Sequence, residues 1–276
     1  MLLHEFDPNK DAVINPEMLV NKIEDFPDVT VSCFSKKLFN NVLSFFDPKQ
    51  ITEVHSAVGL SPVYEVVYQG ERFAFYQSYV GEPKCIGDYE DIMAMGSKCL
   101  ILLGNCGVLD RTIEDCGIII PTKAIRDEGA SYHYAPPSDT IDVNKKYKHL
   151  FKEVLNQFGY PYVEGTTWTT DACYRETREK VQRRKAQSVL RWNAPECRRC
   201  AIFAEPIFSS SFMREITWIT RAGSPEAFRG KAAWMIRARS RCLHLSWDSR
   251  SKRKIKKNKK RKEMPFGISF RFVLMK

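Results

Sequence analysis

Residues 98–107 read KCLILLGNCG, an apolar run that ends in two closely spaced glycines. An uninterrupted run such as Cys99 to Leu103 is typical of a strand that is buried on both faces of a sheet. Glycines directly after such a strand leave backbone N–H groups open at the carboxyl edge of the sheet, a geometry that suits phosphate. The alternative is a plain strand-to-loop turn, and this short stretch by itself favours the turn.

Strand patterns and helix patterns alternate on both sides of this run. The expected strands cover residues 29–34, 63–68, 73–80, 117–121 and 161–164, and the expected helices cover residues 37–46, 89–95 and 145–158. The two strands before and after Gly70 are expected to pair around a tight turn. Alternation of strand and helix predicts an α/β fold.

The charge divides the chain into two parts. Residues 1–180 carry 18 basic and 27 acidic side chains, a balance of −9, whereas the remaining 96 residues carry +19 and bring the whole chain to +10. Residues 252–262 alone hold nine Lys and Arg, a density typical of a solvated segment or of one with an anionic partner. We therefore expect an α/β domain over residues 1–185 and a divergent, irregular, partly disordered basic region over residues 186–276.

Several classes of protein are disfavoured by the composition. No run of 18 apolar residues is present and the first ten residues lack a signal-peptide pattern, so we expect a cytoplasmic protein with no membrane association. Nine cysteines at irregular spacing predict free, mostly buried thiols. Cys197 and Cys200 form a CxxC pair, but Cys242 and His244 are poorly spaced second partners, so we expect no metal.

Two polar segments carry candidate chemistry. Residues 124–137, AIRDEGASYHYAPP, place an Arg, carboxylates, tyrosines and a His where little apolar periodicity exists. They suit either the rim of a pocket, with Arg126, Glu128 and His133 facing it, or a surface loop with an internal Arg–carboxylate pair. Residues 166–178, TTWTTDACYRETR, suit a polar pocket through Thr170 and Asp171, or a helix N-cap formed by either of these two residues.

These segments resemble the nucleoside phosphorylase family, in particular its uridine phosphorylase-like branch. The likeness rests on DEGASYHYAPP at residues 127–137, on TTWTTDACYRET at residues 166–177 and on INPEMLVNKIEDFPDVTVSCFS at residues 14–35. It covers most of residues 1–185. It implies a central mixed β-sheet flanked by helices, a homo-oligomer (dimer or hexamer), and phosphorolysis of a nucleoside, with uridine favoured, to free base and ribose 1-phosphate. No cofactor is implied, because inorganic phosphate is the co-substrate.

The resemblance also implies positions for the site. Phosphate would bind at Gly104, Asn105, Cys106 and Gly107, with Lys36 near the position of an early phosphate-binding Arg. Leu102 stands where many members have an Arg, so the phosphate site lacks that positive charge. Base recognition falls on Glu176 and Arg178, and Tyr174 would replace a stacking aromatic whose usual place holds Cys173. No residue is assigned as the catalytic acid or base.

The resemblance fails after about residue 185. Similar proteins carry a ribose-binding Val-Glu-Met-Glu strand there, whereas residues 186–197 of this chain read AQSVLRWNAPEC, and we expect both the acid pair and the strand to be absent. Each lost carboxylate–hydroxyl bond costs about 1.5–3 kcal/mol, so we expect impaired activity. A resemblance at 247–250 leads to the hypothesis of a reading-frame change between about residues 186 and 245, which peptide mapping would test.

Two alternative functions remain at this point. A nucleosidase would use water in place of phosphate, and the apolar Leu102 makes this more credible. A non-catalytic protein would bind anions or nucleic acid through residues 252–262, because each neutralised phosphate releases counterions. Solvated basic tails are commoner than specific readers of nucleic acid, so we expect nucleoside and phosphate, and no nucleic acid, as partners.

Overall fold

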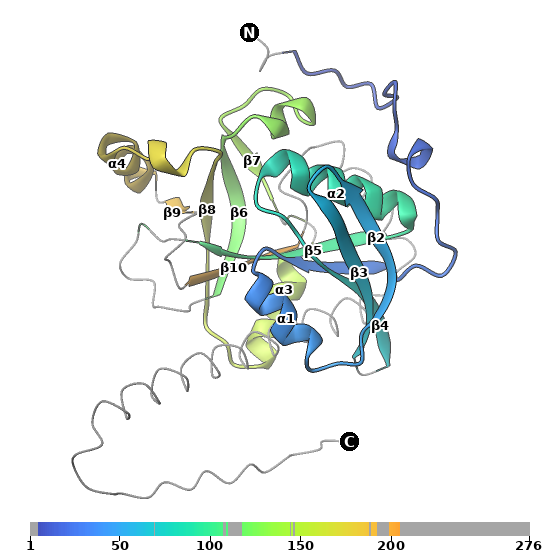
Figure 1. Cartoon of the computed structure of the whole chain (residues 1–276). Helices are drawn as coiled ribbons and strands as arrows, with labels where there is room; N and C mark the ends of the chain where they lie inside the picture. The colour runs from blue at the N-terminus through green and yellow to red at the C-terminus, as the bar shows by residue number, and fades with distance from the viewer. Residues whose placement is uncertain are drawn as a thin grey trace, which may run out of the picture.

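The computed structural model describes residues 5–68, 70–106, 109, 118–143, 145, 147–187, 189–191 and 199–204. Within these residues the centre is one sheet in the order β2-β3-β4-β1-β5-β10-β6-β8-β9, with β7 paired to β6 (Figure 1). The strands are β1 Val29–Cys33, β2 Lys49–Ser56, β3 Gly59–Tyr68, β4 Glu71–Gln77, β5 Cys99–Cys106, β6 Ile118–Asp127, β7 Thr140–Asp142, β8 Tyr162–Thr170, β9 Val189–Arg191 and β10 Arg199–Ala204. The helices are α1 Lys36–Leu43, α2 Glu82–Met95, α3 Lys148–Gln157 and α4 Arg178–Ala186, with single 3₁₀ turns η2 Pro16–Met18, η3 Ala130–His133 and η4 Cys173–Arg175.

The sheet is mixed, as the resemblance implies. Strand β1 runs parallel to both β4 and β5, and β6 runs parallel to β8, whereas β2, β3 and β4 pair antiparallel. Strand β10 is antiparallel to β5 and parallel to β6, so β1, β4 and β5 run opposite to β6 and β8. In Figure 1 strands β6 and β8 cross the direction of β1 and β5, as expected for a strongly twisted sheet.

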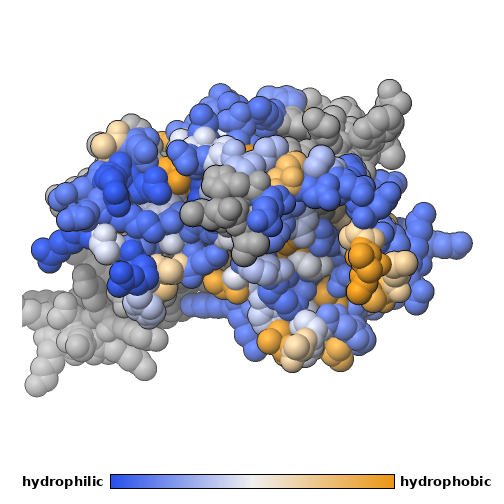
Figure 2. Space-filling view, turned by 90° about the horizontal axis from the view of Figure 1, so that it is seen from above, coloured by the Kyte–Doolittle hydropathy of each residue, from blue (hydrophilic) through white to orange (hydrophobic). Residues whose placement is uncertain are grey.

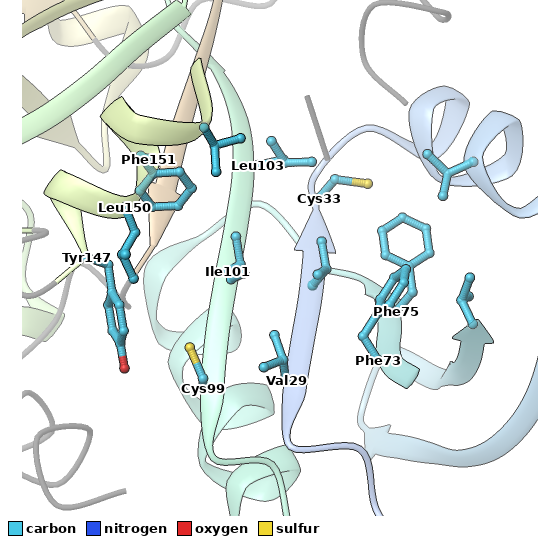
Figure 3. Close-up of a cluster of buried hydrophobic side chains, with 14 of the residues drawn as sticks. Val29, Cys33, Phe73, Phe75, Cys99, Ile101, Leu103, Tyr147, Leu150 and Phe151 are labelled. Atoms are coloured by element: carbon cyan, nitrogen blue, oxygen red, sulfur yellow. The ribbon is translucent and has the colours of Figure 1, made fainter. Parts of the chain in front are cut away.

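Helices cover both faces of the sheet. Helices α1 and α3 pack on one face, where Phe39, Phe75, Ile101 and Phe151 belong to one buried cluster (Figure 3). Helix α2 packs on the other face, against a second cluster that includes Tyr76. The α/β prediction, with a mixed sheet between helices, is therefore confirmed.

The alternation of side chains along β4 and β5 explains why these strands lie at the centre. Successive residues of a strand point to opposite faces. Phe73 and Phe75 face α1, while Ala74 and Tyr76 face α2, and all four are completely buried. Residues 99–103 alternate in the same way and are at most 7% exposed. This double burial is the reason that the sequence shows a continuous apolar run here.

The strands predicted at 29–34, 63–68, 73–80 and 99–103 are confirmed as β1, β3, β4 and β5, with longer or shifted ends. The three predicted helices are confirmed as α1, α2 and α3, and the strand predicted at 117–121 forms the start of β6. Strand β5 does not stop at Gly104, as the turn prediction requires, but continues to Cys106, because β10 pairs with it in the register Ala201↔Gly104 and Arg199↔Cys106. The strand predicted near residues 161–164 extends to Thr170 as β8.

The expected loss of a strand after residue 185 was wrong. Strand β9 pairs with β8 in the register Thr167↔Leu190, and β10 lies between β5 and β6. Both strands contain short apolar runs, such as Ala201 to Ala204 in β10, which fit a pleated sheet. The division at residue 185 stays a prediction, but the sheet itself draws on residues beyond it. The basic run at residues 252–262 and the segment 247–250 lie outside the described residues.

The surface at the end of the sheet that carries the loops after β6 and β8 is mostly hydrophilic. Figure 2 looks onto this end and shows hydrophobic residues in separate small groups. The most exposed apolar side chains include Val13, Met18 and Leu19 of the N-terminal segment, at 96%, 70% and 72%. Among the described residues, no helix has the length and apolar character needed to cross a membrane.

Candidate functional site

The ends of β6 and β8 bring the two polar segments together. The two strands are parallel and in register at Asp127↔Thr170, so the chains that leave them start side by side. The backbone N–H of Gly129, two residues after β6, donates to Asp171 Oδ2, one residue after β8, at 3.1 Å. The sequence separates these residues by about forty positions, and the parallel register removes that separation.

Glu128 organises the turn that follows β6. Its carboxylate accepts from the backbone N–H of Ser131 at 2.9 Å and from the Ser131 hydroxyl, and only 9% of the residue is exposed. A carboxylate that accepts from a backbone N–H three residues later satisfies a donor at the start of a helical turn, here η3. Glu128 therefore holds a turn in shape and does not point freely into solvent.

Arg126 is buried inside the loop that follows β6. It is 6% exposed, and its guanidinium lies 3.9 Å from the centre of the Tyr132 ring. The predicted Arg–carboxylate pair is not among its contacts, since every hydrogen-bond partner found within the described residues is a hydroxyl or carbonyl oxygen. These partners are Ser131 Oγ at 2.7 Å, Pro136 O at 2.7 Å, Ser138 Oγ at 3.0 Å and Ala135 O at 3.3 Å. Arg126 braces the loop.

Asp127 anchors helix α4 to the sheet. Its Oδ2 accepts from Trp168 Nε1 at 2.8 Å and lies 2.6 Å from Lys180 Nζ. Trp168 is completely buried, and the charged groups of Lys180 and Arg184 lie over its ring at 5.6 and 5.5 Å. Because α4 buries none of its own residues fully, these contacts fix its position.

The segment between β8 and α4 carries the residues expected to bind the base. Tyr174 lies in η4 and is 97% exposed, Glu176 is half-buried, and Arg178 begins α4 with an exposed side chain. The predicted helix cap at Thr170 or Asp171 was wrong, because Thr177 Oγ1 accepts from Lys180 N at 3.3 Å and caps α4. Thr170 is instead buried at the end of β8, where its hydroxyl accepts from Ala172 N at 3.4 Å.

The expected phosphate-binding residues lie at the ends of β1 and β5. These two strands are parallel and in register at Cys33↔Leu103, so the residues that follow each strand leave the same edge. Lys36 is exposed at the start of α1, whose N-cap is Ser35, and Gly104 to Cys106 form the last part of β5. Cys106 is completely buried, and Gly107 lies outside the described residues. Leu102 is also buried, at 1% exposed.

Polar side chains line the α2 face beneath these strand ends. Ser32 Oγ and Tyr89 Oη are 2.7 Å apart, Tyr76 Oη donates to Ser78 Oγ at 3.2 Å, and Ser78 Oγ lies 3.1 Å from Cys85 Sγ. Burial raises the pKa of both tyrosines well above the ordinary value and that of the Cys85 thiol to about 11. These tyrosine and cysteine side chains are therefore uncharged, and their hydrogen bonds form a buried polar network, here called the hydrogen-bonded floor, beneath the ends of β1 and β5.

Glu82 is a residue of this region that the motifs did not indicate. It is the first residue of α2, is 6% exposed, and its carboxyl group lies against Glu128 and the backbone of Ala130. Burial, then the neighbouring charges of Glu128 and Asp171, raise its pKa to about 11. The sequence signal was an acid in Gly81-Glu82-Pro83, a few residues after β4 and at the start of α2.

The pKa of Asp171 is also raised, mainly by burial, although the Gly129 N–H opposes this effect. Three acidic side chains from α2, β6 and β8 thus converge. Within the part of the chain that the structure describes, no group of His, Cys, Asp and Glu is arranged to hold a metal ion.

His133 lies apart from these acids. It is exposed and lines a cavity of about 1060 Å³ between the N-terminal segment and the outer side of α2, which also includes Tyr134, Lys84 and Asp91. The structure therefore brings Glu128 and Asp171 together with Glu82. Among the described contacts, none joins them to Lys36 or to residues 104–106.

Comparison with known proteins finds similarity over part of the chain. Residues 77–191 match the family model of the phosphorylase superfamily. A purine nucleoside phosphorylase of Plasmodium vivax (strain Salvador I) is 25% identical over 111 residues, which cover 40% of this chain and 45% of that protein. The chain thus aligns with less than half the length of this curated relative.

Solved structures share the fold at low sequence identity. Uridine phosphorylase from Vibrio fischeri ES114 has a TM-score of 0.57 at 15% identity, covering 82% of this chain and 97% of that chain. A 5′-methylthioadenosine/S-adenosylhomocysteine nucleosidase from Helicobacter pylori has a TM-score of 0.52 at 11% identity, covering 79% and 100%. Futalosine hydrolase of Helicobacter pylori strain 26695 has a TM-score of 0.51 at 13% identity, covering 75% and 97%. The matched segment, residues 77–191, covers less than half of the chain and is similar to the phosphorylase superfamily.

Proposed function

We propose that this protein cleaves the glycosidic bond of a nucleoside by phosphorolysis, with uridine as the preferred substrate. The observation that carries the proposal is the segment 77–191, which matches the superfamily model and contains both polar motifs. The parallel register of β6 and β8 sets these motifs side by side. The products would be the free base and ribose 1-phosphate.

The reaction requires that phosphate be held beneath the sugar and that the departing base be stabilised, because the transition state has positive charge on the sugar ring. In this proposal the chain around Lys36 and residues 104–107 receives phosphate, since β1 and β5 end at one edge. The exposed Arg178 and Tyr174, with Glu176 between them, receive the base. The turn bonded through Gly129 and Asp171 is close to this segment along the chain, since Asp171 comes three residues before Tyr174.

The direct test incubates the purified protein with uridine in the presence and absence of inorganic phosphate and measures free uracil. We expect uracil release that requires phosphate and that is slow, since the chain lacks the Val-Glu-Met-Glu pair of similar proteins. Arg178→Ala should reduce kcat/KM for uridine, whereas Lys22→Ala, an exposed residue far from both motifs in sequence, is the matched control. Absence of uracil release at high enzyme concentration would overturn the proposal.

A second candidate is hydrolysis, in which water replaces phosphate. Leu102 favours it, because a buried apolar side chain stands where similar proteins place a phosphate-binding Arg. One solved structure with this fold is a nucleosidase. The same assay separates the two reactions, because a nucleosidase releases base and free ribose at an equal rate without phosphate.

We propose further that the protein assembles as a homo-oligomer, a dimer or hexamer, and acts in the cytoplasm. The exposed apolar side chains of Val13, Met18 and Leu19 support assembly, since such residues are commonly covered at interfaces. Cys85 and Cys173 are free thiols, which suits a reducing compartment. Sedimentation equilibrium tests the first proposal, and a single monomeric species would contradict it.

A further inference from the structure

The carboxyl group of Glu82 is buried without an ordinary partner. The residue is 6% exposed, and neither carboxylate oxygen accepts a hydrogen bond from a donor within the described residues. A buried charge without a partner is costly, and a carboxyl group in such a place usually keeps its proton. Glu82 also begins a helix, but no donor of the α2 backbone is among its contacts.

Other acids surround Glu82. Glu128 from the end of β6 and Asp171 from the end of β8 face it, and Cys85 lies one turn along α2. No Lys or Arg forms an ion pair with Glu82, Glu128 or Asp171 among the ion pairs of the described residues. Two ionised carboxylates in contact repel each other and cannot donate a hydrogen bond, so one proton shared between them removes both costs.

The protonation follows from which acid already has donors. Glu128 accepts from the Ser131 backbone and hydroxyl, and Asp171 accepts from the Gly129 backbone. The bond from Gly129 favours the ionised form of Asp171, and the carboxylate oxygens of Glu128 already act as acceptors for Ser131. The carboxylate oxygens of Glu82 accept no hydrogen bond of ordinary geometry from the described residues, although the Ala130 backbone lies near them, so Glu82 is the acid on which a proton is most stable.

We propose that Glu82 is a neutral carboxylic acid that donates its proton in a hydrogen bond to Glu128, and that it acts as a positioning residue for the candidate site. The bond ties the first turn of α2 to the turn at residues 128–131, while Gly129 ties that turn to Asp171. These two hydrogen bonds together connect α2, the turn after β6 and the end of β8. The proton-sharing pair stands without any catalytic activity, and only its consequence for nucleoside cleavage rests on the proposed function.

A pH dependence follows from this arrangement. Burial raises the pKa of folded Glu82 from 4.5 to about 11. Between these two values the folded protein holds a proton that the unfolded chain releases, so stability falls as the pH rises. In Glu82→Gln the amide remains a neutral donor to Glu128 but cannot titrate, so this contribution to the pH dependence disappears.

The test measures thermal unfolding of the full chain between about pH 5 and pH 9 for the native protein, for Glu82→Gln and for the exposed control Glu24→Gln. We expect the Tm of Glu82→Gln to rise above that of the native protein by roughly 2–4 °C for each pH unit. The control should show a constant difference from the native protein. A constant difference for Glu82→Gln would show an ionised Glu82 and would overturn the proposal.

A second measurement covers the case in which the variant does not fold. Infrared spectroscopy of the native protein at neutral pH should show the carbonyl stretch of a protonated carboxylic acid, and its absence would overturn the proposal. Hydrogen exchange of the Ser131 amide should accelerate in Glu82→Ala and be restored in Glu82→Gln, because only the latter keeps a donor. None of these measurements uses substrate, so their failure leaves the proposed reaction to be judged by uracil release.

Discussion

The two faces of the central sheet carry different kinds of side chain, although the same strands form both faces. The face under α1 and α3 is almost entirely aromatic and aliphatic, with Phe75 and Phe151 completely buried. The face under α2 is equally buried but holds the hydroxyl groups of Tyr76 and Tyr89 and the thiol of Cys85. Buried polar groups persist where they are bonded to one another, and they gather on the side that carries Glu82 and the turn after β6. Both faces are packed with apolar side chains, and the α2 face adds buried polar groups next to the candidate site.

The largest effect is expected from an apolar deletion on the first face. Phe75→Ala should lower the free energy of unfolding by about 3–5 kcal/mol, because Phe75 is completely buried and stacks on Phe39 with ring centres 5.1 Å apart. Urea denaturation measures this loss. A loss below about 1 kcal/mol would show that the apolar face contributes little, and the comparison would fail.

A smaller effect is expected from a polar deletion on the second face. Tyr89→Phe keeps the ring but removes the hydroxyl that lies 2.7 Å from Ser32 Oγ, which leaves the buried Ser32 without that bond. The expected loss is about 1–2 kcal/mol in the same urea experiment. An unchanged or increased stability would show that the hydrogen-bonded floor carries no structural benefit.

The smallest effect is expected in thiol chemistry. Burial raises the pKa of Cys85 to about 11, so its thiol stays protonated and unreactive across neutral pH, whereas Cys173 is exposed. Brief treatment with iodoacetamide, followed by peptide mass spectrometry, should label Cys173 and leave Cys85 unmodified up to about pH 9. Comparable labelling of both would show that the α2 face opens to solvent.

The sequence predicted the features that depend on local pattern. The continuous apolar run at residues 99–103 indicated a doubly buried strand, because each side chain on either face is apolar. The length of β5 was not predictable, since it depends on pairing with β10, which comes about one hundred residues later. The same pairing is why the expected loss of strands after residue 185 was wrong.

The residues of the candidate site were predicted only where they lie within one continuous polar segment of the sequence. Glu128 and Asp171 were named from polar segments, but their connection through Gly129 depends on the parallel register of β6 and β8. Arg126 was expected at a pocket rim, whereas hydroxyl and carbonyl partners within its own loop bury it. Glu82 was missed because a single acid at a helix start is common, and its burial depends on packing by distant turns.

The most direct measurement of the central claim is the identification of the sugar product by ³¹P NMR during incubation of the full-length protein with uridine and inorganic phosphate. We predict that a phosphate monoester resonance of ribose 1-phosphate grows at the rate at which uracil appears, and that it grows more slowly in Arg178→Ala. Release of uracil with free ribose and no new phosphorus resonance would contradict phosphorolysis. No release of uracil would contradict nucleoside cleavage altogether.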